Sequence, residues 1–153
     1  MPASALLDAA RGMVVTRVAS LQQQLAALDA SQAGETKSSA GDKFETSREM
    51  MQQERDRLEA QLAVMLGHAR ALDAAERRPP SEIVGLGSAL RLSNGQAILL
   101  ATGYGKLREG PHAGAVCISL ESPLGKALAG KRVGDAILLA GTPHRVAELL
   151  HDA

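Results

Sequence analysis

The chain has 153 residues, with 17 Lys and Arg against 17 Asp and Glu, and so carries no net formal charge. Balanced charge argues against binding to bare nucleic acid or to an anionic membrane surface. With one Phe, one Tyr and no Trp, the chain also lacks the side chains for an aromatic base-stacking platform or an aromatic-lined ligand pocket.

Residues 3–33 carry an apolar side chain at every seventh position, which is typical of a coiled-coil seam. The seam residues are Leu7, Val14, Leu21 and Leu28, with Val18 and Leu25 in intermediate places. Residues 46–77 repeat this pattern with Met51, Leu58, Met65 and Leu72, and with Leu62 and Ala69 in the intermediate places. Arg11 and Arg55 interrupt the two series, and we expect them to be solvated or to snorkel and to make no specific contact. Two matched seams predict an antiparallel coiled-coil hairpin.

The polar stretch between the two seams predicts the tip of this hairpin near residues 34–45. It carries Asp42 and Glu45, one helical turn apart, so that their carboxylates can point the same way. Such a pair suits Mg²⁺, which takes one or two carboxylates from a protein. Helix capping is the alternative, since Ser39 with Asp42 and Thr46 with Glu49 fit capping boxes. The two interpretations are compatible, because one acid can cap the helix while the other reaches outward.

Pro79-Pro80 cannot continue a helix, so the hairpin is predicted to end there. We therefore divide the chain into a hairpin domain, residues 1–78, and a second domain, residues 79–153. In the second domain, Asn94-Gly95 is a strong turn dipeptide between two short apolar runs and predicts a β-hairpin.

Further along, a strand is expected within Ala115–Leu120 and another within Ala136–Ala140. Between them, Ser122-Pro123 opens a short helix, with Ser as N-cap and Pro at the first helical position. The composition of Arg145–Leu150 favours helix, whereas a small antiparallel sheet would take it as a strand. The sequence thus predicts the α + β class, with a coiled-coil hairpin followed by a small α+β domain.

Two stretches together resemble the bacterial Gre-type transcript cleavage factors. Gly41-Asp42-Lys43-Phe44-Glu45 is similar to the Gly-Asp-x-x-Glu tip of that family. Residues 118–135 are similar to its signature of a strand, Ser-Pro-Leu, a short helix and Gly-Lys-x-Val-Gly-Asp. The order, spacing and total length also match. The amino-acid sequence around the tip, residues 35–51, looks like that of a subgroup of short Gre-like proteins.

The resemblance implies that the second domain is FKBP-like and docks on the rim of the RNA polymerase secondary channel through Ser122, Pro123 and Leu124. It implies that the hairpin enters the channel, where Asp42 and Glu45 help to hold a second Mg²⁺ that is shared with the polymerase. The polymerase then hydrolyses its own backtracked transcript. On this account the chain is not an enzyme, has no cofactor of its own and meets nucleic acid only within that complex.

Three functions are open to such a chain: stimulation of transcript cleavage, occupancy of the same channel without cleavage, and the activity of a prolyl isomerase or chaperone. The second alternative draws support from the tip, where residues 35–49 contain four acids and three bases. The third follows from the FKBP-like fold, but the active site of that fold is an aromatic-walled pocket, and the chain has too few aromatic residues to form one. The single Cys117 excludes an intramolecular disulfide. No signal peptide or membrane span is evident, so we expect a cytoplasmic protein with no membrane partner that is monomeric when free.

Overall fold

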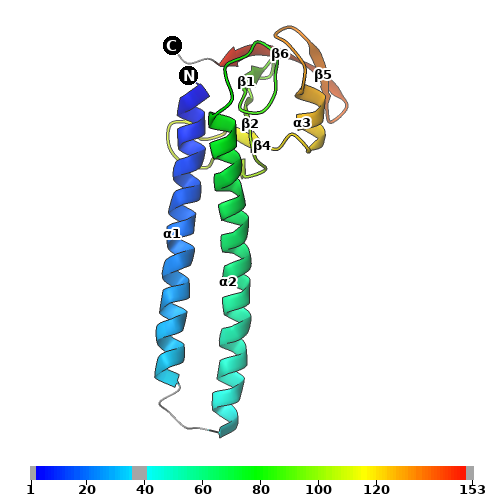
Figure 1. Cartoon of the computed structure of the whole chain (residues 1–153). Helices are drawn as coiled ribbons and strands as arrows, with labels where there is room; N and C mark the ends of the chain where they lie inside the picture. The colour runs from blue at the N-terminus through cyan, green and yellow to red at the C-terminus, as the bar shows by residue number, and fades with distance from the viewer. Residues whose placement is uncertain (1–2, 36–40, 151–153) are drawn as a thin grey trace. The chain divides into compact units, whose positions relative to one another are not determined.

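The computed structural model describes residues 3–35 and 41–150, with side chains for all of these except residues 34–35 and 41–44. The chain forms two compact units. One comprises Met1–Met13 and His68–Ala153, and the other comprises Val14–Gly67. The helices α1 (Ala3–Glu35) and α2 (Gly41–Glu76) each contribute to both units (Figure 1). α1 ends at Glu35 and α2 begins at Gly41, and both residues fall within the stretch 34–45 that the sequence predicts as the tip.

Within the unit Val14–Gly67, the predicted seam is the buried face of the helix pair. Val14, Leu21 and Leu58 are almost fully buried there. The guanidinium of Arg17 donates to Gln61 Oε1 at 2.7 Å, and Arg55 pairs with Asp29. Contacts that pair a rising residue number on α1 with a falling number on α2 define an antiparallel packing, as predicted.

The expectation that Arg11 and Arg55 are solvated was wrong. Arg55 is ion-paired with Asp29 and also reaches Gln32 Oε1 at 3.4 Å. In the other unit, Arg11 Nη2 donates to Asp73 Oδ1 at 3.0 Å and to Glu76 Oε2 at 2.8 Å. The hydrogen bond to Glu76 raises the pKa of the Arg11 guanidinium above its ordinary value. Each arginine lies at the border of the seam, beside acids on the facing helix, so these pairs help to fix the register of α1 against α2.

The unit that contains the C-terminal half is built around one mixed sheet. Its strands are β1 (Ala89–Leu92), β2 (Ala97–Leu100), β3 (Gly105–Lys106), β4 (Val116–Ile118), β5 (Ala136–Leu139) and β6 (Thr142–Leu150). The order across the sheet is β3-β4-β2-β1-β6-β5. Among the strands of residues 41–150, β2 and β4 run parallel, while the other neighbours are antiparallel. The α + β class, with a helical hairpin followed by a small α+β domain, is confirmed.

The predicted hairpin at Asn94-Gly95 is present as β1 and β2. Gly95 has φ +90°, which a glycine adopts at little cost, and its N–H donates to Leu92 O at 2.9 Å. The ambiguous segment Arg145–Leu150 is a strand, because it lies within β6 and pairs with both β1 and β5. The short strand β3 was missed, since its Gly-Lys sequence has no strand pattern of its own.

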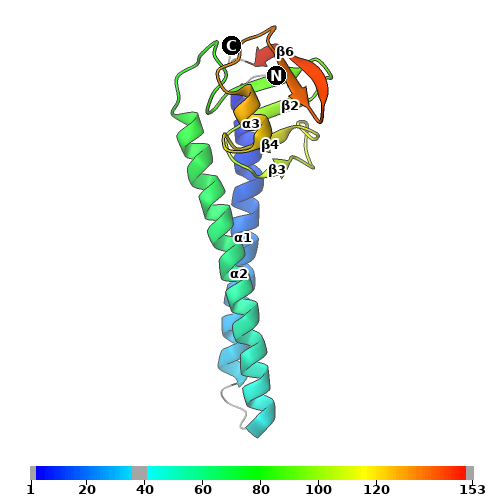
Figure 2. The same cartoon turned by 90° about the vertical axis from the view of Figure 1, so that its right-hand side faces the viewer.

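The helix α3 (Pro123–Leu128) packs on one face of this sheet and closes its core (Figure 2). The buried side chains of this core cluster are Val84, Leu90, Leu92, Ile98, Leu100, Leu128, Ile137 and Val146. Leu120 and Leu124 pack against the same cluster from the segment that opens α3. The burial of apolar side chains therefore determines the position of α3. The loop that precedes α3 is held in place by the same packing.

The same unit also takes in the first part of α1 and the last part of α2. Leu6, Leu7 and Ala10 of α1, and Leu72 and Ala75 of α2, are buried there. The switch from helix to sheet falls at the prolines, as predicted, but the compact unit extends beyond 79–153 because these helical segments pack with it. In the described part of the chain, no helix is both long enough and apolar enough to cross a membrane.

Candidate functional site: the start of α2 and the start of α3

The predicted tip acids lie at the beginning of α2. Gly41 is the first helical residue, so Asp42 and Glu45 fall in the first turns and are separated by three positions. The side chain of Glu45 is exposed, as are those of Arg48 and Glu49. The side chain of Asp42 lies outside the described residues, and so does Ser39, the predicted capping partner. The helical backbone from Gly41 onward is the arrangement that the spacing of the two acids requires.

Acids at this place have a favourable electrostatic environment. The N-terminus of a long helix carries a partial positive charge, so carboxylates in its first turns stabilise the helix. Their oxygens are also the donors that Mg²⁺ prefers. Among the described residues, no group of three or more His, Cys, Asp and Glu side chains is arranged to hold a metal ion. The start of α2 therefore offers carboxylates that can cap a helix or join a metal held by another molecule.

The predicted docking residues lie at the start of α3, where Ser122 is the N-cap. Its Oγ accepts a hydrogen bond from Gly125 N at 3.0 Å and donates to Ser119 O at 2.7 Å. Leu124 is half-buried against the core. Pro123, at the first helical position, is exposed. Of the three residues, Ser122 and Leu124 hold the loop in place and Pro123 presents its side chain to solvent.

The shape of this loop depends on Gly125, which is buried. A Cβ at this position would lie 2.0 Å from Ser119 O and 3.0 Å from Leu120 Cα. Both are backbone atoms, so a side chain cannot be accommodated by a rotamer change. Gly125 thus allows α3 to begin directly against the end of the segment that follows β4, and this close approach determines where Pro123 is presented.

Two further exposed apolar side chains lie in the stretch that follows α3. Val133 is 54% exposed and Leu138, on β5, is 69% exposed. The burial of β5 alternates, with Ile137 in the core and Leu138 on the opposite face. The sequence predicts a strand within Ala136–Ala140, and the observed burial shows that one of its faces is open to solvent.

A polar cluster around His68 was missed in the sequence. His68 Nδ1 lies 2.7 Å from Thr102 Oγ1, and its ring makes an edge-on contact with Tyr104 at a centroid distance of 5.7 Å. Burial lowers the pKa of His68 below its usual value. Burial also raises the pKa of the nearby Cys117 thiol, which hydrogen bonds to the backbone of Thr102 and Tyr104, so this thiol is not an activated nucleophile. The cluster joins α2 to the sheet, and the separation of 34 positions between His68 and Thr102 gives no local sequence signal.

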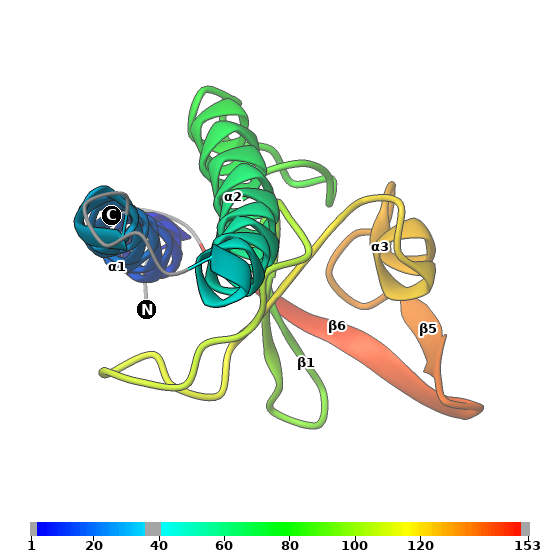
Figure 3. The same ribbon diagram turned by 90° about the horizontal axis from the view of Figure 1, so that it is seen from below.

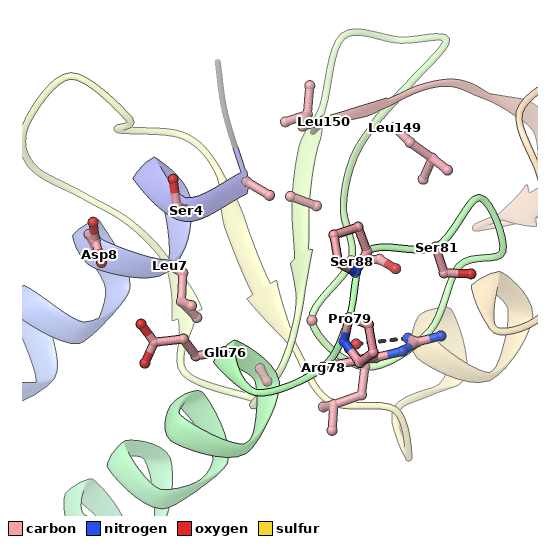
Figure 4. A pocket seen from close by; sticks show the side chains of 16 residues that line it. Ser4, Leu7, Asp8, Glu76, Arg78, Pro79, Ser81, Ser88, Leu149 and Leu150 are labelled. Carbon is pink, nitrogen blue, oxygen red and sulfur yellow. Dashed lines mark hydrogen bonds between the residues drawn. The ribbon is translucent and has the colours of Figure 1, made fainter. Parts of the chain in front are cut away.

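A hollow of about 210 Å³ lies in the same unit, lined by the first turns of α1, the end of α2 and the segment that leads into β1 (Figure 4). Arg78 lines it and donates from Nη1 to Leu86 O at 2.7 Å. Two carboxylates on its wall, those of Asp8 and Glu76, lie 3.9 Å and 2.8 Å from the guanidinium of Arg11. Glu76 thus takes part in an ion pair between α1 and α2, and Asp8 in one within α1, so we assign this hollow a structural role.

Neither a family model nor a curated protein matches the chain. Among solved structures, it is similar to "Structure of the transcription factor Gfh1", with 22% identity and a TM-score of 0.36 over 92% of this chain and 93% of the other. It is also similar to the GreA factor homolog 1 (Gfh1) protein of Thermus thermophilus, with 23% identity and a TM-score of 0.35 over 92% and 94% of the two chains. In its sequence motifs and in its order of a helical hairpin and a small mixed-sheet domain, the chain resembles the Gre-type elongation factors.

Proposed function

We propose that this chain is a Gre-like factor that binds RNA polymerase, inserts the start of α2 into the secondary channel and stimulates cleavage of backtracked transcripts. The observation that carries the proposal is the position of Asp42 and Glu45 in the first turns of the second helix of an antiparallel pair. The resemblance of residues 41–45 and 118–135 to the Gre-type motifs supports the same function. The chain would act in the cytoplasm, as a monomer, with no catalytic centre of its own.

In this proposal the residues of the chain contribute binding, position and charge. Asp42 and Glu45 would supply carboxylate oxygens to a Mg²⁺ shared with the polymerase active centre, and that ion would assist attack by water on the RNA phosphodiester. The helical backbone would hold the two acids three positions apart on one side of the helix, so that both carboxylates can reach the same ion. The α3 end of the C-terminal domain would hold the factor on the rim of the channel.

A second function is favoured by the charge of the tip. Residues 35–49 contain the acids Glu35, Asp42, Glu45 and Glu49 and the bases Lys37, Lys43 and Arg48. Positive charge close to carboxylates weakens their attraction for a cation. On this alternative, the chain occupies the secondary channel without stimulating cleavage and acts as a regulator or a competitor of Gre-type factors. Both functions require binding to the polymerase, so the docking surface is tested first.

Pro123→Arg should weaken binding to core RNA polymerase by about 10-fold or more, because it places charge and bulk at the exposed start of α3. The free energy of unfolding should change by less than about 1 kcal/mol, since Ser122 keeps its capping bond and Pro123 has an exposed side chain. Binding is measured by surface plasmon resonance on immobilised polymerase and stability by urea unfolding. Ala129→Arg adds the same charge at an exposed position after the other end of α3 and is the matched control. If the two variants change polymerase binding equally, Pro123 has no specific role in the interface.

A further inference from the structure

A second hollow lies on the sheet-containing unit, and none of its lining residues is used in the proposed function. It has a volume of about 330 Å³ and is formed by the β1–β2 turn and the loop that leads into β4. Figure 3 shows both segments, the green turn after β1 and the yellow-green loop. The lining includes Arg91, Asn94, Gln96 and His112. The hollow is therefore bounded by polar side chains from two separate loops.

The walls of this hollow are held together by Gln96. Its Nε2 donates to Ala97 O at 2.8 Å and to Gly114 O at 2.8 Å, which ties the turn to the loop. The loop is further fixed by the bonds from Gly114 N to Leu107 O and from Leu107 N to Ala115 O, both at 2.8 Å. A site whose walls are already ordered loses little conformational entropy when a ligand binds.

Several polar groups on these walls have no hydrogen-bond partner in the part of the chain that the structure describes. Both amide hydrogens of Gln96 are used, so its Oε1 remains as an acceptor. Arg91 uses Nη1 for Gly95 O at 2.8 Å and Nε for Glu148 Oε1 at 3.3 Å, which leaves Nη2 as a donor. Asn94 uses only Oδ1, which accepts from Gln96 N at 3.0 Å, so its Nδ2 is a second donor.

His112 supplies the most specific observation, because its Nδ1 is buried and unpaired among the described residues. A proton on this nitrogen would be a buried donor without an acceptor, and such groups are rare in folded proteins. An imidazole with no proton on Nδ1 carries its proton on Nε2, and Nε2 is then a hydrogen-bond donor.

We propose that this hollow binds a carboxylate that carries a neighbouring amide N–H, as in an N-acylated amino acid or the C-terminal end of a peptide. The donors are Arg91 Nη2, Asn94 Nδ2 and His112 Nε2, and a planar guanidinium is well suited to a carboxylate. The amide N–H of the ligand would donate to Gln96 Oε1. The carboxylate of Glu148 pairs with Arg91 and offsets part of its positive charge. The remaining charge would suit a singly charged group better than a multiply charged anion.

The proposal is tested by NMR titration of the whole chain with N-acetylglycine, followed at the amide resonances of residues 94–97 and 112–115. A ligand of this size in such a site should bind with a Kd of about 1 mM. Acetate, which lacks the amide, should bind more weakly, and the neutral N-acetylglycinamide should not bind. A short peptide with a free C-terminal carboxylate, compared with its amidated form, separates a peptide ligand from a small metabolite.

Arg91→Gln should weaken N-acetylglycine binding by about 10-fold or more, because a charged donor is lost. His112→Leu should weaken binding as well but should not lower stability, since it removes an unpaired buried nitrogen. Arg108→Gln changes an exposed arginine of the same loop that does not line the hollow, and it should bind as the wild type does. Absence of saturable binding, equal binding of the neutral analogue, or full binding by both Arg91→Gln and His112→Leu would each overturn the proposal.

Discussion

Asp42→Asn and Glu45→Gln are each expected to reduce stimulation of transcript cleavage by about 10- to 1000-fold, with normal binding to the polymerase. A charge-assisted contact to a hard cation contributes a few kcal/mol, and each 1.4 kcal/mol in a barrier corresponds to about tenfold in rate. Both substitutions keep the size of the side chain, and Asn retains the ability to cap a helix. The helix should therefore survive, and the loss should appear in the cleavage rate of a stalled, backtracked complex.

The matched control for this pair lies on the same helix. Asp56 and Glu59 are an Asp and a Glu at the same spacing of three positions, and both are exposed. Asp56→Asn and Glu59→Gln remove the same charges farther from the start of α2 and should leave cleavage unchanged. If the wild-type chain binds polymerase but does not accelerate cleavage at saturating Mg²⁺, the non-cleaving regulator becomes the better account.

Gly125→Ala should lower the free energy of unfolding of the sheet-containing unit by about 3 kcal/mol, at the upper end of the usual cost of overpacking. The new Cβ would lie 2.0 Å from Ser119 O, so the backbone before α3 must move. Urea unfolding followed at the amide resonances of β2 and β4 measures this loss directly, because both strands line the core that α3 closes.

Gly103→Ala serves as the comparison for this substitution. Gly103 is exposed, its φ is not in the left-handed region, and a Cβ there meets no atom within 4 Å. Its replacement should change stability by less than about 0.5 kcal/mol. Comparable losses in the two variants would show that the close approach at Gly125 is not what determines the position of α3.

Much of the fold could be predicted because its signals are local. The seven-residue spacing of Leu7, Val14 and Leu21 specifies a helix with one apolar stripe, and Asn94-Gly95 specifies a tight turn. The capping of α3 by Ser122 was likewise readable from the Ser-Pro dipeptide. Each of these features depends on residues only a few positions apart, so the sequence alone is enough to predict it.

The features that escaped prediction depend on contacts between distant segments. Arg11 and Arg55 looked like solvated interruptions, because their acidic partners lie on the facing helix. His68 gained its partner Thr102 only through tertiary packing. The polar wall formed by Gln96 and Gly114 joins two loops in the same way. The predicted docking residues show an intermediate case, since the sequence located the loop but not which of its side chains faces solvent.

The central claim, that the start of α2 enters the polymerase, is tested most directly by site-specific photo-crosslinking. A photoreactive amino acid replaces Arg48, an exposed residue near the start of α2, or Arg77, an exposed residue just after its end. In a complex with core RNA polymerase, position 48 should cross-link to the walls of the secondary channel near the active centre, and position 77 should not. A complex that forms normally but gives no cross-link to the channel from position 48 would contradict the account.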